Sequence, residues 1–270
     1  MISTLALFSL APVVFGSPAR RCTGTISSID DVSSAIECTT ININSFTVSA
    51  GQTFSISAPT GATINVPGDV TFGYEEWAGP LFQLTGTDIT FNGNGYTFDG
   101  QGDQYWDGLG SGGSTKPPHD EDQIFGFGND AALTVSKVTV NNSDGNSANS
   151  LSDGKAAGHN TDGFDVSVSD LTIEDSTVIN QDDCLAINKG SNIVFQRNSC
   201  IGGHGISVDS IASDVTVNNV QILDNTVTDN AQGFRIKTDA TATGLWNDHR
   251  RLNGCVGVMD LVQSFVPGSA

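Results

Sequence analysis

The 270-residue sequence predicts an all-β fold of the solenoid type, in which short strands build coils of nearly equal length. Apolar segments recur at a constant interval: Leu185 follows Phe164 at the same spacing at which Ile206 follows Leu185. Phe234 begins the next such segment after a somewhat longer interval. Turn-forming Gly, Asn and Asp separate these segments, and a repeat of roughly 20–30 residues built from short strands is typical of a β-solenoid.

A polar cluster stands beside each recurring apolar segment. The clusters are Asn160-Thr161-Asp162, Gln181-Asp182-Asp183-Cys184, Gly203-His204-Gly205 and Arg235-Ile236-Lys237. Successive coils of a solenoid stack at the strand spacing of roughly 4.8 Å, so residues at equivalent positions form a column. We therefore expect three carboxylates, one histidine and two cations to meet on one face of the protein.

The composition excludes some classes of function. The formal net charge of −19 argues against nucleic-acid binding, which needs a basic face. No central segment is apolar over the length that spans a membrane. The length allows a single large β domain with a sizeable core, and an acidic surface favours solubility.

The N-terminal segment predicts export from the cell. Residues 1–16 are apolar and small, with Val14 and Gly16 placed as at a signal-peptidase site, although no basic residue lies near Met1. A packed or disordered N-terminus is the alternative. Arg20-Arg21 directly before Cys22 predicts the end of a short propeptide, residues 17–21, or is an incidental basic pair.

Five cysteines in an exported chain predict two disulfides and one unpaired cysteine. Cys22–Cys38 would close a short N-terminal loop. Cys184–Cys200 would staple the coil that carries the two adjacent aspartates. Cys255 is then the odd one.

The N-terminal half predicts a cap followed by strands. Apolar residues between Ser28 and Glu37 recur in steps of three and four, which predicts a short amphipathic helix that covers the open end of the solenoid. From Thr39 to Phe98 the apolar residues alternate between Gly, Pro and Asn turns, as in strands.

The segment from Gly100 to Pro118 is predicted to be a long loop beside the groove. Its Tyr105 and Trp106 either anchor the loop by packing or stack on sugar rings. Leu133 to Val140 is predicted to be a strand, and Asn141-Asn142-Ser143 is a glycosylation sequon on the following turn, with Asn141 as its acceptor.

The remaining chain divides at Thr238. Ser143 to His159 is predicted to be a polar loop, and the repeats run from Phe164 to Phe234. The pattern stops after Thr238. We therefore expect a β-helix domain over residues 22–238 and a divergent tail over 239–270.

At the four polar clusters the sequence resembles the fungal polygalacturonases, family 28 of the glycoside hydrolases. Their motifs N-T-D, D-D between Gln and Cys, G-H-G and R-I-K all occur here, in the family's order and close to its spacing. Gly73 to Pro80 and Thr115-Lys116-Pro117 also resemble this family. The resemblance implies a right-handed, single-stranded parallel β-helix. It further implies a secreted, monomeric hydrolase of pectin that cleaves α-1,4 bonds of polygalacturonate, with endo action, no cofactor and no metal.

The resemblance also implies roles for single residues. It makes Asp182 the general acid, and it makes Asp162 and Asp183 the pair that activates water for an inverting reaction. It implies that His204 tunes the acid or shapes the site and that Arg235 and Lys237 bind the substrate carboxylate. Asp165, on the same predicted strand as Gly163, is a candidate for lining a subsite or for capping the core. Clustered carboxyl groups push their pKa values apart, as glycoside hydrolysis requires.

Simpler roles remain for these residues. Asp162 and one of the adjacent aspartates fit as turn formers, and so does His204 between two glycines. Arg235 and Lys237 also fit a solvated strand face. His119, His159 and His249 are expected at the surface.

The sequence departs from the family in three places. Strand sequence is missing between Pro118 and Ala131, the chain ends early after Thr238, and Asp209 adds an acid near His204. We therefore expect a solenoid truncated at its C-terminal end, with the last coil uncovered. The candidate functions are an active polygalacturonase, an inactive truncated relative that at most binds pectin, and another β-helix enzyme such as a rhamnogalacturonan hydrolase or a calcium-dependent lyase.

Overall fold

The computed structural model describes residues 20–113, 125–129, 132–242 and 249–252. The expected signal peptide, most of the expected propeptide, Lys116, His119, Cys255 and most of the C-terminal tail lie outside these residues. None of the described helices is both long and apolar enough to cross a membrane.

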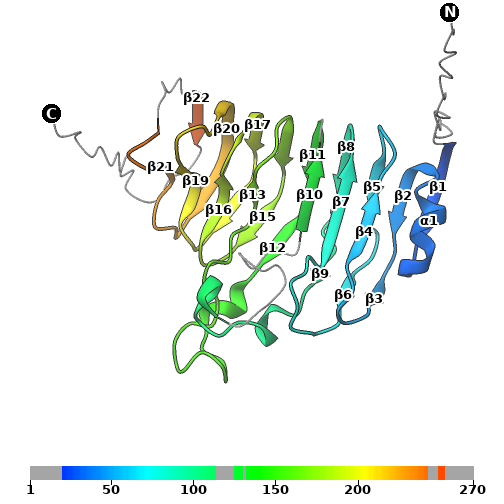
Figure 1. The fold of residues 1–270 in the computed structure, drawn as a ribbon, viewed down its shortest axis with the longest axis horizontal. Coiled ribbons are helices and arrows are strands. Elements are labelled where there is room, and N and C mark those ends of the chain that lie inside the picture. Colours follow the sequence, from blue (N-terminus) through cyan, green and yellow to red (C-terminus); the bar gives the residue numbers. More distant parts are fainter. Residues whose placement is uncertain (1–19, 114–124, 130–131, 243–248, 253–270) are drawn as a thin grey trace, which may run out of the picture.

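The described chain forms a parallel β-helix, which confirms the predicted fold class (Figure 1). A 12-stranded sheet runs the length of the solenoid, and each coil returns to it after one or two further strands. Its strands, in spatial order, are β1 (Arg20–Ile26), β2 (Cys38–Ile43), β5 (Thr63–Asn65), β8 (Ile89–Asn92), β11 (Leu133–Ser136), β14 (Leu171–Glu174), β17 (Gly190–Gln196), β20 (Val217–Thr228), β18 (Ser199–Ile201), β15 (Thr177–Ile179) and β12 (Thr139–Asn141), with β22 (His249–Leu252) paired to β20.

Three shorter sheets complete the coils. The N-terminal coils contribute two of them, made of β3 (Phe46–Val48), β6 (Val70–Phe72) and β9 (Phe98–Asp99), and of β4 (Phe54–Ser57), β7 (Phe82–Gly86) and β10 (Phe125–Asn129). The C-terminal coils contribute the third, which we call the site sheet: β13 (Asp165–Val166), β16 (Asp183–Ile187), β19 (Gly205–Ile211) and β21 (Phe234–Thr238).

The register of the site sheet confirms the spacing found in the sequence. Leu185 pairs with Ile206, and Ile206 pairs with Phe234, so each apolar segment lies directly beside the next one. The apolar repeat therefore marks the coils of the solenoid.

The longer interval before β21 arises between β19 and β20. Val208 of β19 pairs with Ile187, and Val217 of β20 pairs with Gly190. The chain between Val208 and Val217 is thus longer than the corresponding chain of the preceding coil. The additional residues extend β19 to Ile211 and form the turn after it.

A short helical segment covers the N-terminal end, as predicted. It consists of the 3-10 turn η1 (Ile29–Asp31) and helix α1 (Val32–Ala35) beside β1 (Figure 1). Ala35 is buried, and the half-buried Ile29, Val32 and Ile36 pack against the core. The contact is close, because a Cβ on Gly24 of β1 would lie 2.5 Å from the Ala35 carbonyl oxygen.

Aligned side chains connect the coils inside the solenoid. Phe82 lies with its ring centroid 5.2 Å from that of Phe54 in the preceding coil. Amides stack in the same manner along the turns: the side chain of Asn92 donates a hydrogen bond to Asn65 at 3.0 Å, and the Ser136 hydroxyl donates to Asn92 at 2.8 Å. Each coil is thereby held in register with its neighbour.

The solenoid is interrupted between its third coil, which contains β8, β9 and β10, and its fourth coil, which contains β11, β12 and β13. Among the described residues, only the 12-stranded sheet crosses this point, through the pairing of β8 with β11. The sheets that end at β9 and β10 are not continued by β12 and β13. The break coincides with the place where the sequence predicts missing strand residues.

Two strand predictions need adjustment. Leu133 to Val140 forms β11 and β12 rather than one strand. Lys137, between them, adopts a positive φ of 53°, which bends the chain so that β12 starts in a new direction. The segment after Thr238, for which the sequence predicts no strand, contains β22 paired with β20. Main-chain pairing to an open strand edge does not require apolar alternation, so the sequence pattern carries no signal for it.

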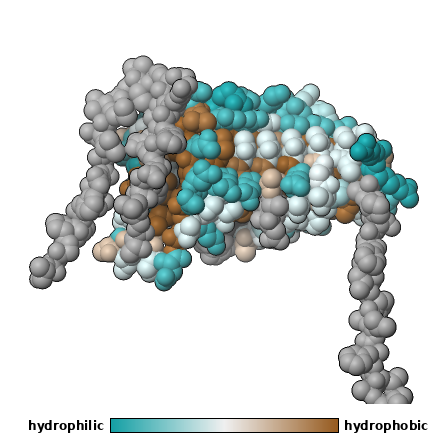
Figure 2. Space-filling view, turned by 90° about the horizontal axis from the view of Figure 1, so that it is seen from above, coloured by the Kyte–Doolittle hydropathy of each residue, from teal (hydrophilic) through white to brown (hydrophobic). Residues whose placement is uncertain are grey.

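The C-terminal coils are less covered than the others. Val217, Val220, Phe234 and Ile236 are half-buried, whereas the apolar residues of earlier strands, such as Ile64, are almost fully buried. Figure 2 shows apolar surface toward this end of the molecule, while the rest of that face is mostly hydrophilic or intermediate in hydropathy, apart from a narrow apolar stripe.

The long loop between β9 and β10 packs by means of its aromatic residues, which confirms the first of the two predicted roles. It includes the 3-10 turns η2 (Gly102–Gln104) and η3 (Gly110–Gly112). Tyr105 and Trp106 are only 5% and 6% exposed. The Tyr105 hydroxyl accepts a hydrogen bond from the backbone N–H of Glu75 at 3.1 Å, which ties the loop to the preceding coil.

Candidate active site

The site sheet brings the four polar clusters together at one end of its strands. Asp162 lies shortly before β13, Asp182 directly precedes β16, and His204 directly precedes β19. Arg235 and Lys237 lie within β21. The structure therefore places all of these residues on neighbouring coils, in agreement with the expected columns.

Special backbone conformations make the turns before these strands possible. Asn160 has a positive φ of 54°, a region in which Asn is better tolerated than most residues. Gly203 has a φ of 72°, and a Cβ at this position would lie 2.2 Å from the Asp182 carbonyl oxygen. The same carbonyl accepts a hydrogen bond from the His204 backbone N–H at 2.7 Å. The glycine before His204 thus allows two successive coils to approach closely.

Asp162, Asp182 and Asp183, which we call the acid cluster, interact through backbone and side chain. A side-chain oxygen of Asp162 accepts a hydrogen bond from the Asp183 backbone N–H at 2.9 Å. Burial, together with the negative charges of Asp182 and Asp183, raises the pKa of Asp162 to about 7. One carboxyl group of the cluster is therefore protonated over much of the acid range.

Asp183 is the most enclosed member of the acid cluster. Arg235 Nη2 donates to both of its carboxylate oxygens, at 2.9 and 2.8 Å, and the Ser207 hydroxyl donates at 2.7 Å. Burial raises the pKa of Asp183, while the hydrogen bonds from Ser207 and Arg235 act in the opposite direction. These donors favour the ionised carboxylate.

Asp182 is paired with His204. The ring atom Nδ1 of His204 lies 2.7 Å from Asp182 Oδ1, and the side-chain amide of Asn160 donates to Asp182 Oδ2 at 3.2 Å. The His204 side chain is 42% exposed and that of Asp182 is 14% exposed. The pair is thus accessible from solvent, unlike Asp183.

One group of side chains is compact enough to hold a cation. Ligand atoms of Asp182, Asp183 and His204 all lie within 4.8 Å of one another, and no other such group occurs among the residues that the structure describes. Arg235 already neutralises Asp183, which reduces the charge available for a metal.

The two cations of β21 both have carboxylate partners. Arg235 binds Asp183, and Lys237 Nζ forms an ion pair with Asp209 Oδ1. The sequence predicts that Asp209 adds an acid near His204, and in the structure this carboxylate pairs with the neighbouring lysine. Binding of a substrate carboxylate by Arg235 and Lys237 stays a prediction.

Asp165 begins β13 and is half-buried. It accepts a hydrogen bond from the side-chain amide of Asn188 at 2.9 Å. Burial raises the pKa of Asp165 to about 6, and the negative charge of Asp209 adds to this shift. Asp165 is thus a second carboxyl group that holds its proton in weakly acidic solution.

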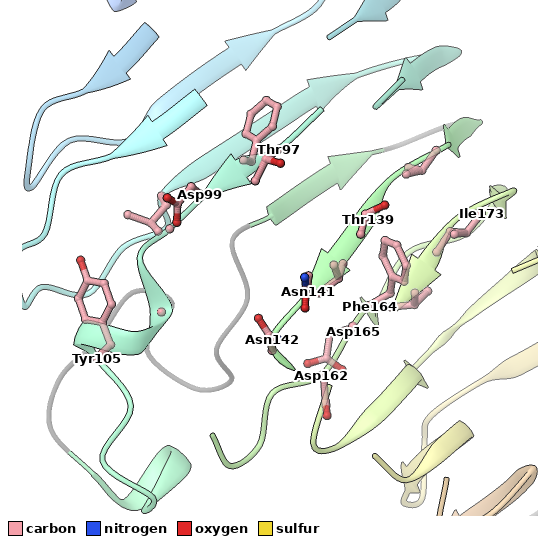
Figure 3. Close-up of a pocket in the computed structure, with 18 of the residues that line it drawn as sticks. Thr97, Asp99, Tyr105, Thr139, Asn141, Asn142, Asp162, Phe164, Asp165 and Ile173 are labelled. Carbon is pink, nitrogen blue, oxygen red and sulfur yellow. The ribbon is translucent and has the colours of Figure 1, made fainter. Parts of the chain in front are cut away.

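A cavity of about 480 Å³ occupies the break between the two halves of the solenoid. Figure 3 shows Asp162 and Asp165 on one side of it, with Asn141 and Asn142 from the end of β12 in the same coil beside them and Tyr105 farther away. The cavity therefore opens beside two of the predicted site residues.

Sequence reasoning missed Asn180, which organises the turn that carries the acid cluster. Its side-chain amide donates to the carbonyl oxygens of Thr161 and Asp183, both at 2.8 Å, and to that of Asp182 at 3.1 Å. Asn180 is 1% exposed. A polar residue directly after the partly buried strand β15 was the available signal, since a buried amide needs partners.

Both predicted disulfides are present. Cys22 is bonded to Cys38, and Cys184 to Cys200, each with a sequence separation of 16. The second bond links the start of β16, next to the acid cluster, to β18. Asn141 is exposed at the end of β12, so its side chain is accessible as the sequon requires, and its glycosylation stays a prediction.

Comparison with known proteins identifies the family. The family model "Glycosyl hydrolases family 28" matches residues 38–253. The chain belongs to glycosyl hydrolase family 28. It is 41% identical over 270 residues to a polygalacturonase of Saccharomyces cerevisiae, covering 90% of this chain and 71% of the relative. It is 40% identical over 277 residues to a probable endopolygalacturonase A of Neosartorya fischeri, covering 90% and 73%.

A solved endopolygalacturonase has the same fold. Endopolygalacturonase I from Stereum purpureum, complexed with two galacturonate molecules, superposes with a TM-score of 0.70 at 42% sequence identity. The match covers 81% of this chain and 69% of that chain. The present chain is thus a glycoside hydrolase of family 28 with a parallel β-helix fold.

Proposed function

We propose that this chain is an endo-acting polygalacturonase, which hydrolyses α-1,4-galacturonosyl bonds inside polygalacturonate chains. The observation that carries the proposal is the proximity of three carboxyl groups, Asp162, Asp182 and Asp183, at the end of one sheet. The names of the relatives support the substrate: they are polygalacturonases and endopolygalacturonases, and the solved relative binds galacturonate.

In this proposal Asp182 is the general acid. It donates its proton to the glycosidic oxygen of the leaving sugar as the bond to the anomeric carbon breaks. Its position supports the role, because it is the partly exposed member of the acid cluster and is held by His204 and Asn160. His204 positions the carboxyl group through the contact of its ring atom Nδ1 with Asp182 Oδ1.

Asp183 and Asp162 activate the water molecule. Water attacks the anomeric carbon and loses a proton to a carboxylate. We assign that acceptance to Asp183, since Arg235 and Ser207 favour its ionised form. Asp162, whose pKa is raised to about 7, holds and orients the water by a hydrogen bond. The two carboxyl groups thereby start the reaction in different protonation states.

Inversion of configuration is proposed from the family resemblance. The separation of Asp182 and Asp183, with oxygens within 4.8 Å, is shorter than the about 6.5–9.5 Å usual for inverting enzymes. Proton NMR of the first-formed product tests the point: the β-anomer of the new reducing end is expected. An α-anomer as the first-formed product would show retention of configuration, and the mechanism would then proceed through a covalent glycosyl-enzyme intermediate.

Arg235, Lys237 and Asp165 are assigned to substrate binding. The net charge of −19 repels a polyanionic substrate, so local cations are needed to bind it. We also propose that residues 1–16 direct secretion, that residues 17–21 are removed as a propeptide, and that the mature protein acts extracellularly as a monomer. Mass spectrometry of the secreted chain tests both cleavages and the glycosylation of Asn141.

The alternative is an inactive truncated relative that at most binds pectin. The break between the third and fourth coils and the half-buried C-terminal coil favour it, because both reduce the packing that holds the site in place. It predicts a folded protein that binds polygalacturonate and releases no reducing ends.

A reducing-end assay on polygalacturonate in the presence of a chelator separates these functions. Chelator-resistant cleavage without a rise in ultraviolet absorbance supports the hydrolase and excludes a calcium-dependent lyase. Asp182→Asn is expected to reduce the rate by at least about a hundredfold, because it removes the proton donor. Asp214→Asn, an exposed turn residue with the same charge change, is the matched control and should retain the wild-type rate.

A further inference from the structure

The ion pair between Asp209 and Lys237 bears on which form of the substrate the site accepts. Asp209 lies on β19 and Lys237 on β21, one position beyond the paired residues Val208 and Ile236. Lys237 Nζ contacts Asp209 Oδ1, and the side chains are 45% and 18% exposed. The lysine is thus open to a ligand, but it already has a carboxylate partner.

We propose that Asp209 is a specificity-determining residue: by pairing with Lys237 it weakens the binding of an ionised galacturonate carboxylate and lets the same position accept the uncharged methyl ester. The inference rests on the proposed function, since it concerns which forms of the galacturonate residue the position beside Lys237 accepts.

Charge and hydrogen bonding explain the effect. An incoming carboxylate must either displace Asp209 from Lys237 or bind beside the negative charge of Asp209. Two like charges that contact the same ammonium group repel each other. The ammonium group of a lysine has three hydrogen-bond donors, so one can remain with Asp209 while another binds the carbonyl oxygen of an ester. An ester adds no charge and therefore meets no such repulsion.

The rest of the site supports this assignment. Arg235, the other cation of β21, already donates hydrogen bonds to both carboxylate oxygens of Asp183. The side chains of Asp162 and Asp165 lie close enough to Asp209 for its charge to disfavour their ionisation. An ionised sugar entering this region meets the negative charge of Asp209 and no cation of β21 that lacks a carboxylate partner, whereas an esterified sugar avoids the repulsion.

Binding of trigalacturonate and of its trimethyl ester tests the proposal, measured by calorimetry above about pH 5, where sugar carboxylates are ionised. Asp209→Asn is expected to tighten trigalacturonate binding roughly three- to tenfold and to change ester binding by less than about twofold. Asp209→Ser is the second variant if the amide perturbs folding. Asp214→Asn makes the same change in net charge in an exposed turn and should alter neither affinity.

The lysine must mediate the effect. In a Lys237→Met background, Asp209→Asn should no longer tighten trigalacturonate binding, since the two substitutions act on one interaction. Equal tightening for both oligomers, or the same gain in Asp214→Asn, would overturn the proposal, as would absence of binding by every variant. Wild-type binding without cleavage would refute the hydrolase function alone, because the affinity ratio still reports on Asp209.

Discussion

Arg235 Nη2 lies 2.9 and 2.8 Å from the two carboxylate oxygens of Asp183, although the two residues stand on different coils of the solenoid and far apart in the sequence. The Asp183 side chain is 3% exposed and that of Arg235 is 19% exposed. A residue predicted to bind substrate is therefore also the counter-ion of a buried catalytic candidate. This double position has a consequence for stability as well as for activity.

Removing the guanidinium should destabilise the protein. Arg235→Ala leaves the carboxylate of Asp183 buried without a counter-ion, and breaking such a pair typically lowers the free energy of unfolding by about 3–5 kcal/mol. Arg197→Ala is the matched control, because Arg197 binds Glu174 and Asp175 at the surface, with 46% of its side chain exposed. It should lower the free energy by about 0.5 kcal/mol. Urea unfolding measures both, and equal losses would contradict a special role for the buried pair.

Asn180 should be intolerant of even an isosteric change. Asn180→Asp replaces an amide donor by a carboxylate facing the carbonyl oxygens of Thr161, Asp182 and Asp183, in a site that is 1% exposed. We expect a loss of about 3 kcal/mol or more in the free energy of unfolding at neutral pH, because a buried acceptor then lacks donors.

Asn219→Asp is the control for Asn180. Asn219 is exposed on β20 and donates one hydrogen bond, to Asn192 at 2.9 Å. Its substitution should change the free energy of unfolding by no more than about 0.5 kcal/mol. A comparable loss in both variants would show that the buried carbonyl oxygens are not the reason for the sensitivity of Asn180.

The sequence predicted the coils because apolar side chains must return to the core once per turn. Leu185 and Ile206 were placed correctly by spacing alone. The break was located instead by the family resemblance, since the segment between Pro118 and Ala131 is shorter than the family pattern implies. Side-chain partners were harder. The pattern placed Arg235 and Lys237 on the outer face, yet a cation has several carboxylates within reach and spacing does not choose among them.

Asn180 and β22 show two other limits. The amide of Asn180 acts on backbone carbonyl groups, which every residue possesses, so its partners leave no trace in the sequence. Strand β22 pairs through its main chain with an open edge of β20, which requires no particular side chains. Both features depend on which backbone atoms are left unsatisfied in the folded structure.

The two disulfides should differ in their contribution, although each closes a loop of the same sequence separation of 16. Loop entropy predicts a loss of about 3 kcal/mol for either pair. Cys184 and Cys200 are fully buried, so Cys184→Ala with Cys200→Ala also leaves a cavity, which adds about 1 kcal/mol. Denaturant unfolding of this double variant is compared with Cys22→Ala and Cys38→Ala, where Cys22 is exposed. A larger loss for the N-terminal pair would contradict the ranking.

The stability of the protein should depend on pH through Asp162. Its pKa is about 7 in the folded state, against about 3.9 in an unfolded chain, so between these values the folded state holds a proton that the unfolded state has released. Stability therefore falls as the pH rises from about 4 to about 7. Asp162→Asn lacks this titration and keeps the oxygen that accepts from the Asp183 N–H. It should exceed wild type by on the order of 2 kcal/mol at pH 8 and equal it at pH 3.

Asp175 provides a control of opposite sign for Asp162. The hydrogen bonds from Arg197 hold the pKa of Asp175 below its usual value, so its contribution to stability is present above about pH 4 and is lost as the pH falls. Asp175→Asn should therefore be less stable than wild type at neutral pH and should converge with it in strong acid. Thermal unfolding of both variants across the pH range measures the two trends. A gain in Asp162→Asn that is the same at pH 3 and pH 8 would mean that improved packing, and not removal of a buried charge, stabilises the variant.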